Sequence, residues 1–214
     1  REILEQVVNR NPGFADGVGA LAMAYFLQPP AGPDDLAKNQ AKALETAERA
    51  LASDPDSIGA LKVLGMSAKD AEKGLSNLRR VVQLDPGDSE GWYWLSIVQN
   101  RFILDGGDPL ESAQKLIEID PLWPPSWAGS GLAARFGDME LARAMEQQVL
   151  SASVTTSQRL LVEARLARLD ADFSEYYRLT QRAALSDTES ERRFNHTLQD
   201  RAIRILLEIL EKQS

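Results

Sequence analysis

A short Asx-Pro phrase recurs along this chain of 214 residues and constrains its fold more than any other feature. The phrase stands at Asn11-Pro12, Asp54-Pro55, Asp85-Pro86 and Asp120-Pro121, and its prolines are 43, 31 and 35 residues apart. Proline disfavours helical geometry in the residue before it and has no N–H to donate, so each phrase predicts the end of a helix. The mean spacing of about 36 residues is close to the roughly 34-residue period of helix-turn-helix repeats. The sequence therefore predicts a stack of similar helix pairs with no sheet.

Small residues recur at matching places in both helices of the predicted pairs. Two antiparallel helices approach each other closely only where small side chains face one another. In the first helix of each pair the small residues are Ala22, Gly65, Ser96 and Gly131. In the second helix they are Ala43, Gly74 and Ala142. Leucine in place of Ala22 or Gly131 is therefore expected to force a helix pair apart.

The repeated pattern resembles the tetratricopeptide-repeat (TPR) signature. Trp92 with Leu95-Ser96, and Trp127 with Gly131, match its W-x2-L-G half, and the small residues of the second helices match its A-x3-F half. The resemblance is good over residues 1–150 and weaker over 151–186. It implies an all-α protein, a right-handed α-solenoid of stacked antiparallel helix pairs.

The domain organisation follows from where the pattern holds. Residues 1–186 are interpreted as TPR-like repeats, with a truncated first repeat and a degenerate stretch at 151–186. Residues 1–11 resemble the second helix of a pair, so the chain is expected to be a fragment of a larger bacterial TPR protein. Residues 187–214 are expected to form one C-terminal helix that caps the last repeat or, alternatively, makes a homodimer. Its apolar stripe is Ile203, Leu206, Leu207 and Leu210.

Turn residues predict the ends of several helices. Asp34 or Asp35 is expected to cap the helix that follows the proline-rich stretch 29–33, and Asp108 is expected to cap the helix that Pro109 begins. Between the helices of later pairs, one turn has Gly137, whereas the turn at 170–172 has Ala171.

Composition excludes several kinds of function. The formal net charge of -8 argues against a general nucleic-acid binder, which usually carries a basic face. The chain has no cysteine and one histidine, so thiolate sites and multi-histidine metal sites are excluded. No apolar run approaches the roughly 18 residues of a membrane span. We therefore expect no enzymatic activity, no cofactor, no metal, no nucleic-acid partner and no membrane insertion, with a cytoplasmic location favoured and a periplasmic one left open.

The resemblance implies where a partner would bind. In TPR proteins a concave groove is lined by the first helix of each repeat, and its matching positions combine methionine, aromatic and cationic side chains suited to peptides. The predicted partner-binding residues are Met23, Phe26, Lys62, Met66, Tyr93, Ile97, Asn100, Arg101 and Arg135. The expected function is that of a non-catalytic scaffold that binds a protein or peptide. Two alternatives stay open: a regulatory or sensor module of a multidomain bacterial regulator or cyclase, and the accessory TPR region of an enzyme.

Overall fold

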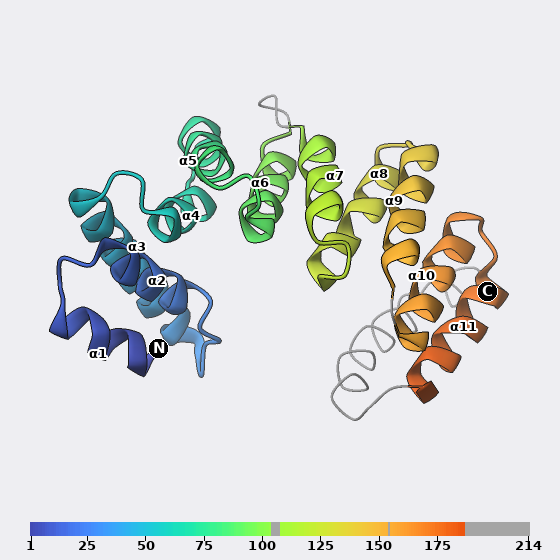
Figure 1. The fold of residues 1–214 in the computed structure, drawn as a ribbon, viewed down its shortest axis with the longest axis horizontal. Coiled ribbons are helices and arrows are strands. Elements are labelled where there is room, and N and C mark those ends of the chain that lie inside the picture. Colours follow the sequence, from blue (N-terminus) through green and yellow to red (C-terminus); the bar gives the residue numbers. More distant parts are fainter. Residues whose placement is uncertain (104–107, 154, 187–214) are drawn as a thin grey trace. The chain divides into compact units, whose positions relative to one another are not determined.

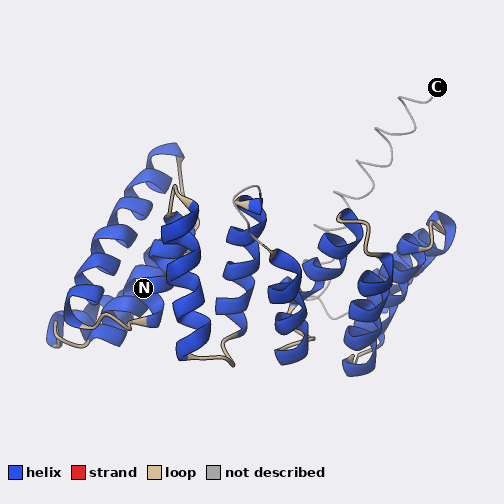
Figure 2. Cartoon of the chain, turned by 90° about the horizontal axis from the view of Figure 1, so that it is seen from above, coloured by secondary structure: helices blue, strands red, loops and turns tan. Residues whose placement is uncertain are grey.

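The computed structural model describes residues 1–103, 108–153 and 155–186. Within them all regular structure is helical and there is no strand (Figures 1 and 2), which confirms the all-α prediction. The chain divides into two compact units, Arg1–Ile119 and a second unit that begins at Asp120. The C-terminal helix predicted for 187–214 lies outside the described residues, so the cap and the homodimer remain predictions.

Outside residues 104–107, the first unit contains three helix pairs preceded by a single helix (Figure 1). Its helices are α1 (Glu2–Arg10), α2 (Ala15–Phe26), α3 (Pro33–Ser53), α4 (Ile58–Ser67), α5 (Ala71–Leu84), α6 (Ser89–Arg101) and α7 (Pro109–Ile119). Helix α2 packs on α3, α4 on α5, and α6 on α7. The first helices also pack side by side, α2 with α4 and α4 with α6. This stacking brings side chains of α2, α4 and α6 to one surface.

The second unit contains two helix pairs in the residues that the structure describes. Its elements are the 3-10 turn η2 (Pro124–Trp127), α8 (Ala128–Arg135), α9 (Met139–Ala152), α10 (Thr156–Leu169) and α11 (Phe173–Ser186). Helix α8 packs on α9, α10 packs on α11, and α9 contacts α10, so the pairs follow one another as in the first unit.

The aspartates of the recurring phrases hold the turns between repeats. One carboxylate oxygen of Asp54 accepts a hydrogen bond from the backbone N–H of Asp56 at 3.0 Å, and that of Asp85 accepts one from Gly87 at 3.0 Å. Asp120 accepts one from a backbone N–H three residues later, at 3.2 Å. Such side-chain bonds mimic a backbone turn. The phrase therefore both ends one helix and sets the direction of the next.

Two tryptophans fasten the following first helix to the same turns. The Trp92 indole N–H donates to the carbonyl oxygen of Pro86 at 2.9 Å. The Trp127 indole N–H donates to the carbonyl oxygen of Pro121 at 3.1 Å. A tryptophan at this repeat position thus supplies apolar packing and one directed hydrogen bond to the turn, which explains why it recurs six residues after the proline.

Of the helix caps predicted from the sequence, one is confirmed and one is wrong. Asp108 accepts a hydrogen bond from the backbone N–H of Leu110 at 3.2 Å, as predicted, and α7 begins at Pro109. The cap predicted at Asp34 or Asp35 is wrong, because α3 begins at residue 33 and both aspartates lie in its first turn. There their negative charges still interact favourably with the positive end of the helix dipole.

Helix α1 is attached to α2 through Tyr25. The Tyr25 hydroxyl donates to a carboxylate oxygen of Glu5 at 2.9 Å, and Leu4 and Val8 pack into the same core cluster. Burial, followed by the hydrogen bond to Glu5 and its negative charge, raises the pKa of Tyr25 above 10.0. The folded state therefore favours the protonated phenol more than the unfolded chain does.

The raised pKa predicts a loss of stability at alkaline pH. The contribution of Tyr25 is fully present below pH 10, the ordinary tyrosine value, and is lost as the pH rises through the higher folded-state value. The free energy of unfolding of the wild type should then fall more steeply in this window than that of Tyr25→Phe. Urea unfolding at a series of alkaline pH values measures this, and identical slopes for the two proteins would contradict it.

The turns of the second unit require a left-handed backbone at one residue. Gly137 has a φ of +84°, and Ala171, at the corresponding turn, has a φ of +58°. In this geometry a residue with a Cβ is strained by about 1–2 kcal/mol. Glycine avoids the strain but loses more conformational entropy on folding, so its net advantage is smaller. Ala171→Gly should therefore raise the free energy of unfolding by about 0.5–1 kcal/mol, whereas Gly137→Ala should lower it by about 1 kcal/mol. Urea unfolding compares the two, and a change in the same direction for both would refute the assignment.

Candidate partner-binding surface

The candidate surface is formed by the side chains of α2, α4 and α6 that are not covered by other helices; we name it the first-helix surface. Its shape depends on a backbone contact between α2 and α4. A Cβ atom on Gly59 would lie 2.6 Å from the carbonyl carbon of Gly19 and 2.7 Å from its oxygen. Only glycine permits this approach, and the two helices therefore meet backbone to backbone. Side chains that flank the crossing are drawn into the protein.

Three of the predicted partner-binding residues are buried. Met23 is 9% exposed, Lys62 6% and Met66 4%. Both methionines belong to the core cluster of α1–α4. The prediction that their side chains face a partner does not agree with this burial, because the methionines pack into the core and Lys62 is covered by its carboxylate partners at the start of α6. They support the first-helix surface from below.

Lys62 is instead the centre of an ion-pair cluster between α4 and the start of α6. Its ammonium nitrogen lies 2.7 Å from a carboxylate oxygen of Asp88 and 2.8 Å from one of Glu90. The Asp88 side chain is 13% exposed, whereas that of Glu90 is 36% exposed. One buried cation thus faces two carboxylates, and Glu90 presents the more accessible of them.

An aromatic cluster joins α2 to α6. The rings of Phe26 and Trp94 meet edge to face with centroids 6.3 Å apart, and the Tyr93 ring lies 4.8 Å from that of Trp94. All three side chains are only partly buried. Trp94 is a residue that the sequence reasoning did not include in the site. The sequence does distinguish Trp94 from a core tryptophan. Trp94 does not occupy the repeated tryptophan position, and helical geometry turns it well away from Trp92.

The other predicted residues of α6 lie further along the same helix. Ile97 and Asn100 are partly buried, and Arg101 is exposed. The Arg101 guanidinium donates to the backbone carbonyl of Met66 at 2.9 Å and lies 6.0 Å from the ring centroid of Phe102. Arg101 therefore satisfies a carbonyl in the last turn of α4, which makes it a link between first helices as well as a surface cation.

Arg135 belongs to the second unit. It is exposed at the end of α8, with its guanidinium 5.4 Å from the centroid of the Phe136 ring. The structure thus brings Phe26, Tyr93, Ile97, Asn100 and Arg101 to the surface of the first unit, and Arg135 is described only within its own unit.

A buried polar cluster lies between the helix pairs of the second unit. Glu146 of α9 is 1% exposed and accepts hydrogen bonds from the Arg165 Nε at 2.7 and 2.9 Å, as well as one from the Ser130 hydroxyl. The Arg165 guanidinium lies over the Trp127 ring, 4.8 Å from its centroid. Ser130 and Glu146 correspond by repeat position to Leu95 of α6 and to apolar residues of the other second helices. This repeat therefore replaces an apolar contact by a charged one.

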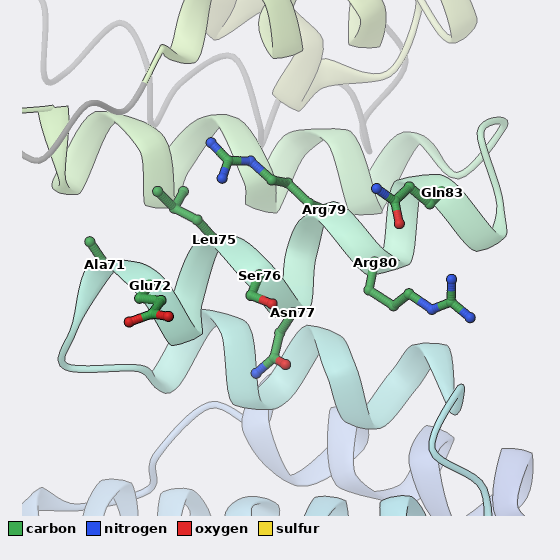
Figure 3. A pocket seen from close by; sticks show the side chains of 8 residues that line it. All are labelled: Ala71, Glu72, Leu75, Ser76, Asn77, Arg79, Arg80 and Gln83. Carbon is green, nitrogen blue, oxygen red and sulfur yellow. The ribbon is translucent and has the colours of Figure 1, made fainter.

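Two hollows of the described surface lie away from the first-helix surface. One, of about 660 Å³, runs along α5, and Figure 3 shows its eight lining side chains projecting from successive turns of that single helix. Another, of about 630 Å³, lies between α1 and the end of α2. None of the nine predicted partner-binding residues lines either hollow.

The described residues meet neither the requirements of a metal site nor those of a membrane-spanning helix. No group of three or more His, Cys, Asp or Glu side chains there could hold a metal ion. In the same part of the chain, none of the helices combines the length and the apolar character needed to cross a bilayer.

No family model and no curated protein matches the sequence, but solved structures with a similar arrangement of helices do, a TPR protein among them. PilF of Pseudomonas aeruginosa is 19% identical, with a TM-score of 0.58 over 91% of this chain and 86% of PilF. PilW, a type IV pilus biogenesis factor, is 15% identical, with a TM-score of 0.58 over 84% of this chain and 80% of PilW. A thermophilic TPR protein of Thermus thermophilus is 19% identical, with a TM-score of 0.50 over 75% of this chain and 90% of that one. The chain therefore has the fold of a TPR protein, as the recurring phrases predicted.

Proposed function

We propose that this chain is a non-catalytic scaffold that binds a peptide or protein segment on its first-helix surface. The observation that carries the proposal is the cluster of Phe26, Tyr93 and Trp94, three aromatic side chains that remain partly accessible although the residues beneath them are buried. Tryptophan, tyrosine and arginine are enriched among the few residues that dominate binding energy in protein interfaces.

The arrangement of the surface favours a peptide over a small molecule. Side chains from α2 and α6 meet above α4, so a bound segment would touch several repeats at once. The surface is not one of the hollows found along α5 or beside α1, whereas small-molecule sites are usually enclosed and mostly apolar. An extended or helical segment can instead collect many modest contacts along an open face.

The test begins with selection of binders from a random dodecapeptide library displayed on phage. Fluorescence anisotropy then gives the dissociation constant of a selected peptide for the wild type and for Tyr93→Ala and Arg101→Ala. We expect Tyr93→Ala to weaken binding about tenfold, since the loss of a central aromatic contact costs more than 1 kcal/mol. Gln83→Ala, at an exposed position of α5, is the matched control and should leave the dissociation constant unchanged.

Two outcomes would contradict the proposal. One is that the selected peptides bind the wild type, Tyr93→Ala and Arg101→Ala equally well. The other is that these variants retain binding while substitution of Leu206 and Leu210 by aspartate abolishes it, which would place the working surface in the C-terminal stretch.

A further inference from the structure

We propose that the segment bound by the first-helix surface is cationic, with a lysine or arginine seated beside Glu90 and an apolar or aromatic side chain on the Phe26–Trp94–Tyr93 cluster. This inference rests on the proposed function and specifies the chemistry of the partner. It combines the charge of the Lys62 cluster with its position next to the aromatic rings.

The first step is the charge of the Lys62 cluster. Lys62 offers one positive charge to the carboxylates of Asp88 and Glu90, which lie 2.7 and 2.8 Å from its ammonium nitrogen. The positive end of the α6 dipole adds the equivalent of about half a positive charge at this helix terminus. The cluster therefore keeps a negative charge of about half a unit, and Glu90 is its most accessible member, at 36% side-chain exposure.

The second step is the distance to the nearest compensating cation on the same helix. Glu90 lies in the first turn of α6, and Arg101 is the last residue of that helix. At 1.5 Å per residue, the eleven residue steps from Glu90 to Arg101 correspond to about 16 Å along the helix axis. This exceeds the Debye length of about 8 Å at physiological ionic strength, so Arg101 does not neutralise Glu90. On α6, therefore, no other cation is close enough to compete with a cation of the partner for Glu90.

The third step is the position of the aromatic rings. Tyr93 follows Glu90 by three residues, and side chains with this spacing are neighbours on a helix surface. The Tyr93 ring is in turn 4.8 Å from that of Trp94. A lysine or arginine next to Glu90 can therefore also approach an aromatic ring, and cation–π contact adds to the ion pair. A carboxylate in the same place would be repelled by Glu90 and by the electron-rich ring faces.

The fourth step is the apolar part of the segment. Phe26 and Trp94 extend the cluster from α6 back to α2, and both rings leave part of their apolar surface exposed. An apolar side chain of the partner would cover this exposed apolar surface without desolvating a charge. The segment is thus expected to alternate between cationic and apolar or aromatic residues, with few acidic ones.

The test uses the random dodecapeptide library against the full chain. Lysine and arginine should outnumber aspartate and glutamate among the selected peptides, relative to the unselected library. For a selected cationic peptide, Glu90→Gln should weaken binding about threefold to tenfold, and higher salt should weaken binding to the wild type more than to Glu90→Gln. Glu72→Gln, at an exposed position on α5, is the control and should bind as the wild type does. Circular dichroism confirms that each variant remains folded.

The outcomes separate this inference from the proposed function. If acidic or uncharged peptides are selected and still require Tyr93, the surface binds peptides but the inferred charge is wrong. If cationic peptides are selected and Glu90→Gln binds them as well as the wild type does, the inferred contact is wrong. If the selected peptides do not require Tyr93, or if the library yields no binder, both the inference and the proposed function are overturned.

Discussion

Gly59→Val is expected to lower the free energy of unfolding of the first unit by about 3 kcal/mol or more. A Cβ at this position would lie 2.6 and 2.7 Å from backbone atoms of Gly19, and backbone cannot move aside as a flexible side chain can. Overpacking of a well-filled contact usually costs about 1–3 kcal/mol, and a clash with backbone belongs at the upper end or above it. Urea unfolding followed by circular dichroism measures the loss. Because α2 and α4 carry the first-helix surface, the same substitution should also weaken peptide binding.

Gly131→Ala provides the matched control in the other unit. Nothing lies within 4 Å of the place where its Cβ would stand. Glycine inside a helix is less favourable than alanine by about 0.5–1 kcal/mol, so this substitution should be neutral or stabilising by that amount. Equal destabilisation by Gly59→Val and Gly131→Ala would show that glycine at these positions serves something other than close approach.

The contrast between two glycines shows how far the repeat pattern predicts packing. At Gly65 the small-residue prediction is confirmed, because an added Cβ would lie 2.6 Å from the Leu78 side chain. At Gly131 the same prediction is wrong. The residue that corresponds to Leu78 is Glu146, whose carboxylate is directed to Ser130 and Arg165 instead. The sequence pattern predicts which positions face each other, but the contact distance depends on the side chain opposite.

The candidate site was likewise predictable in part: the helix on which each residue lies was predicted, and its burial was not. Repeat positions place all the predicted residues on first helices, as the structure has them, because this depends only on helical periodicity and the prolines. The burial of Met23, Lys62 and Met66 could not be predicted, since it depends on which side chains the neighbouring helices place against them. The partners of Lys62 are 26 and 28 residues away in sequence, and only the stacking of α4 and α6 brings them together.

Removal of the buried carboxylate of Glu146 is the second change with a large expected effect. Glu146→Leu should lower the free energy of unfolding of the second unit by about 3–5 kcal/mol, the usual cost when one partner of a buried ion pair is deleted. The reason is Arg165, whose side chain is only 16% exposed and would lose both of its hydrogen bonds to the carboxylate. The Trp127 ring still lies against the guanidinium, but a cation–π contact of about 0.5–2 kcal/mol does not offset that loss. Urea unfolding again measures the change.

The double variant Glu146→Leu with Arg165→Met decides whether charge or shape causes the loss. A buried ion pair replaced by apolar residues of similar volume is often neutral or stabilising, because neither charge then has to leave water. Other repeats carry apolar residues at the position of Glu146, Leu78 among them at 0% exposure, so the helix packing itself accepts them. The double variant should therefore regain most of the stability that Glu146→Leu loses. If it is as unstable as the single variant, the shape of the Glu146 side chain matters and its charge does not. If it recovers, the ion pair is an exchangeable substitute for the apolar contact found in the other repeats.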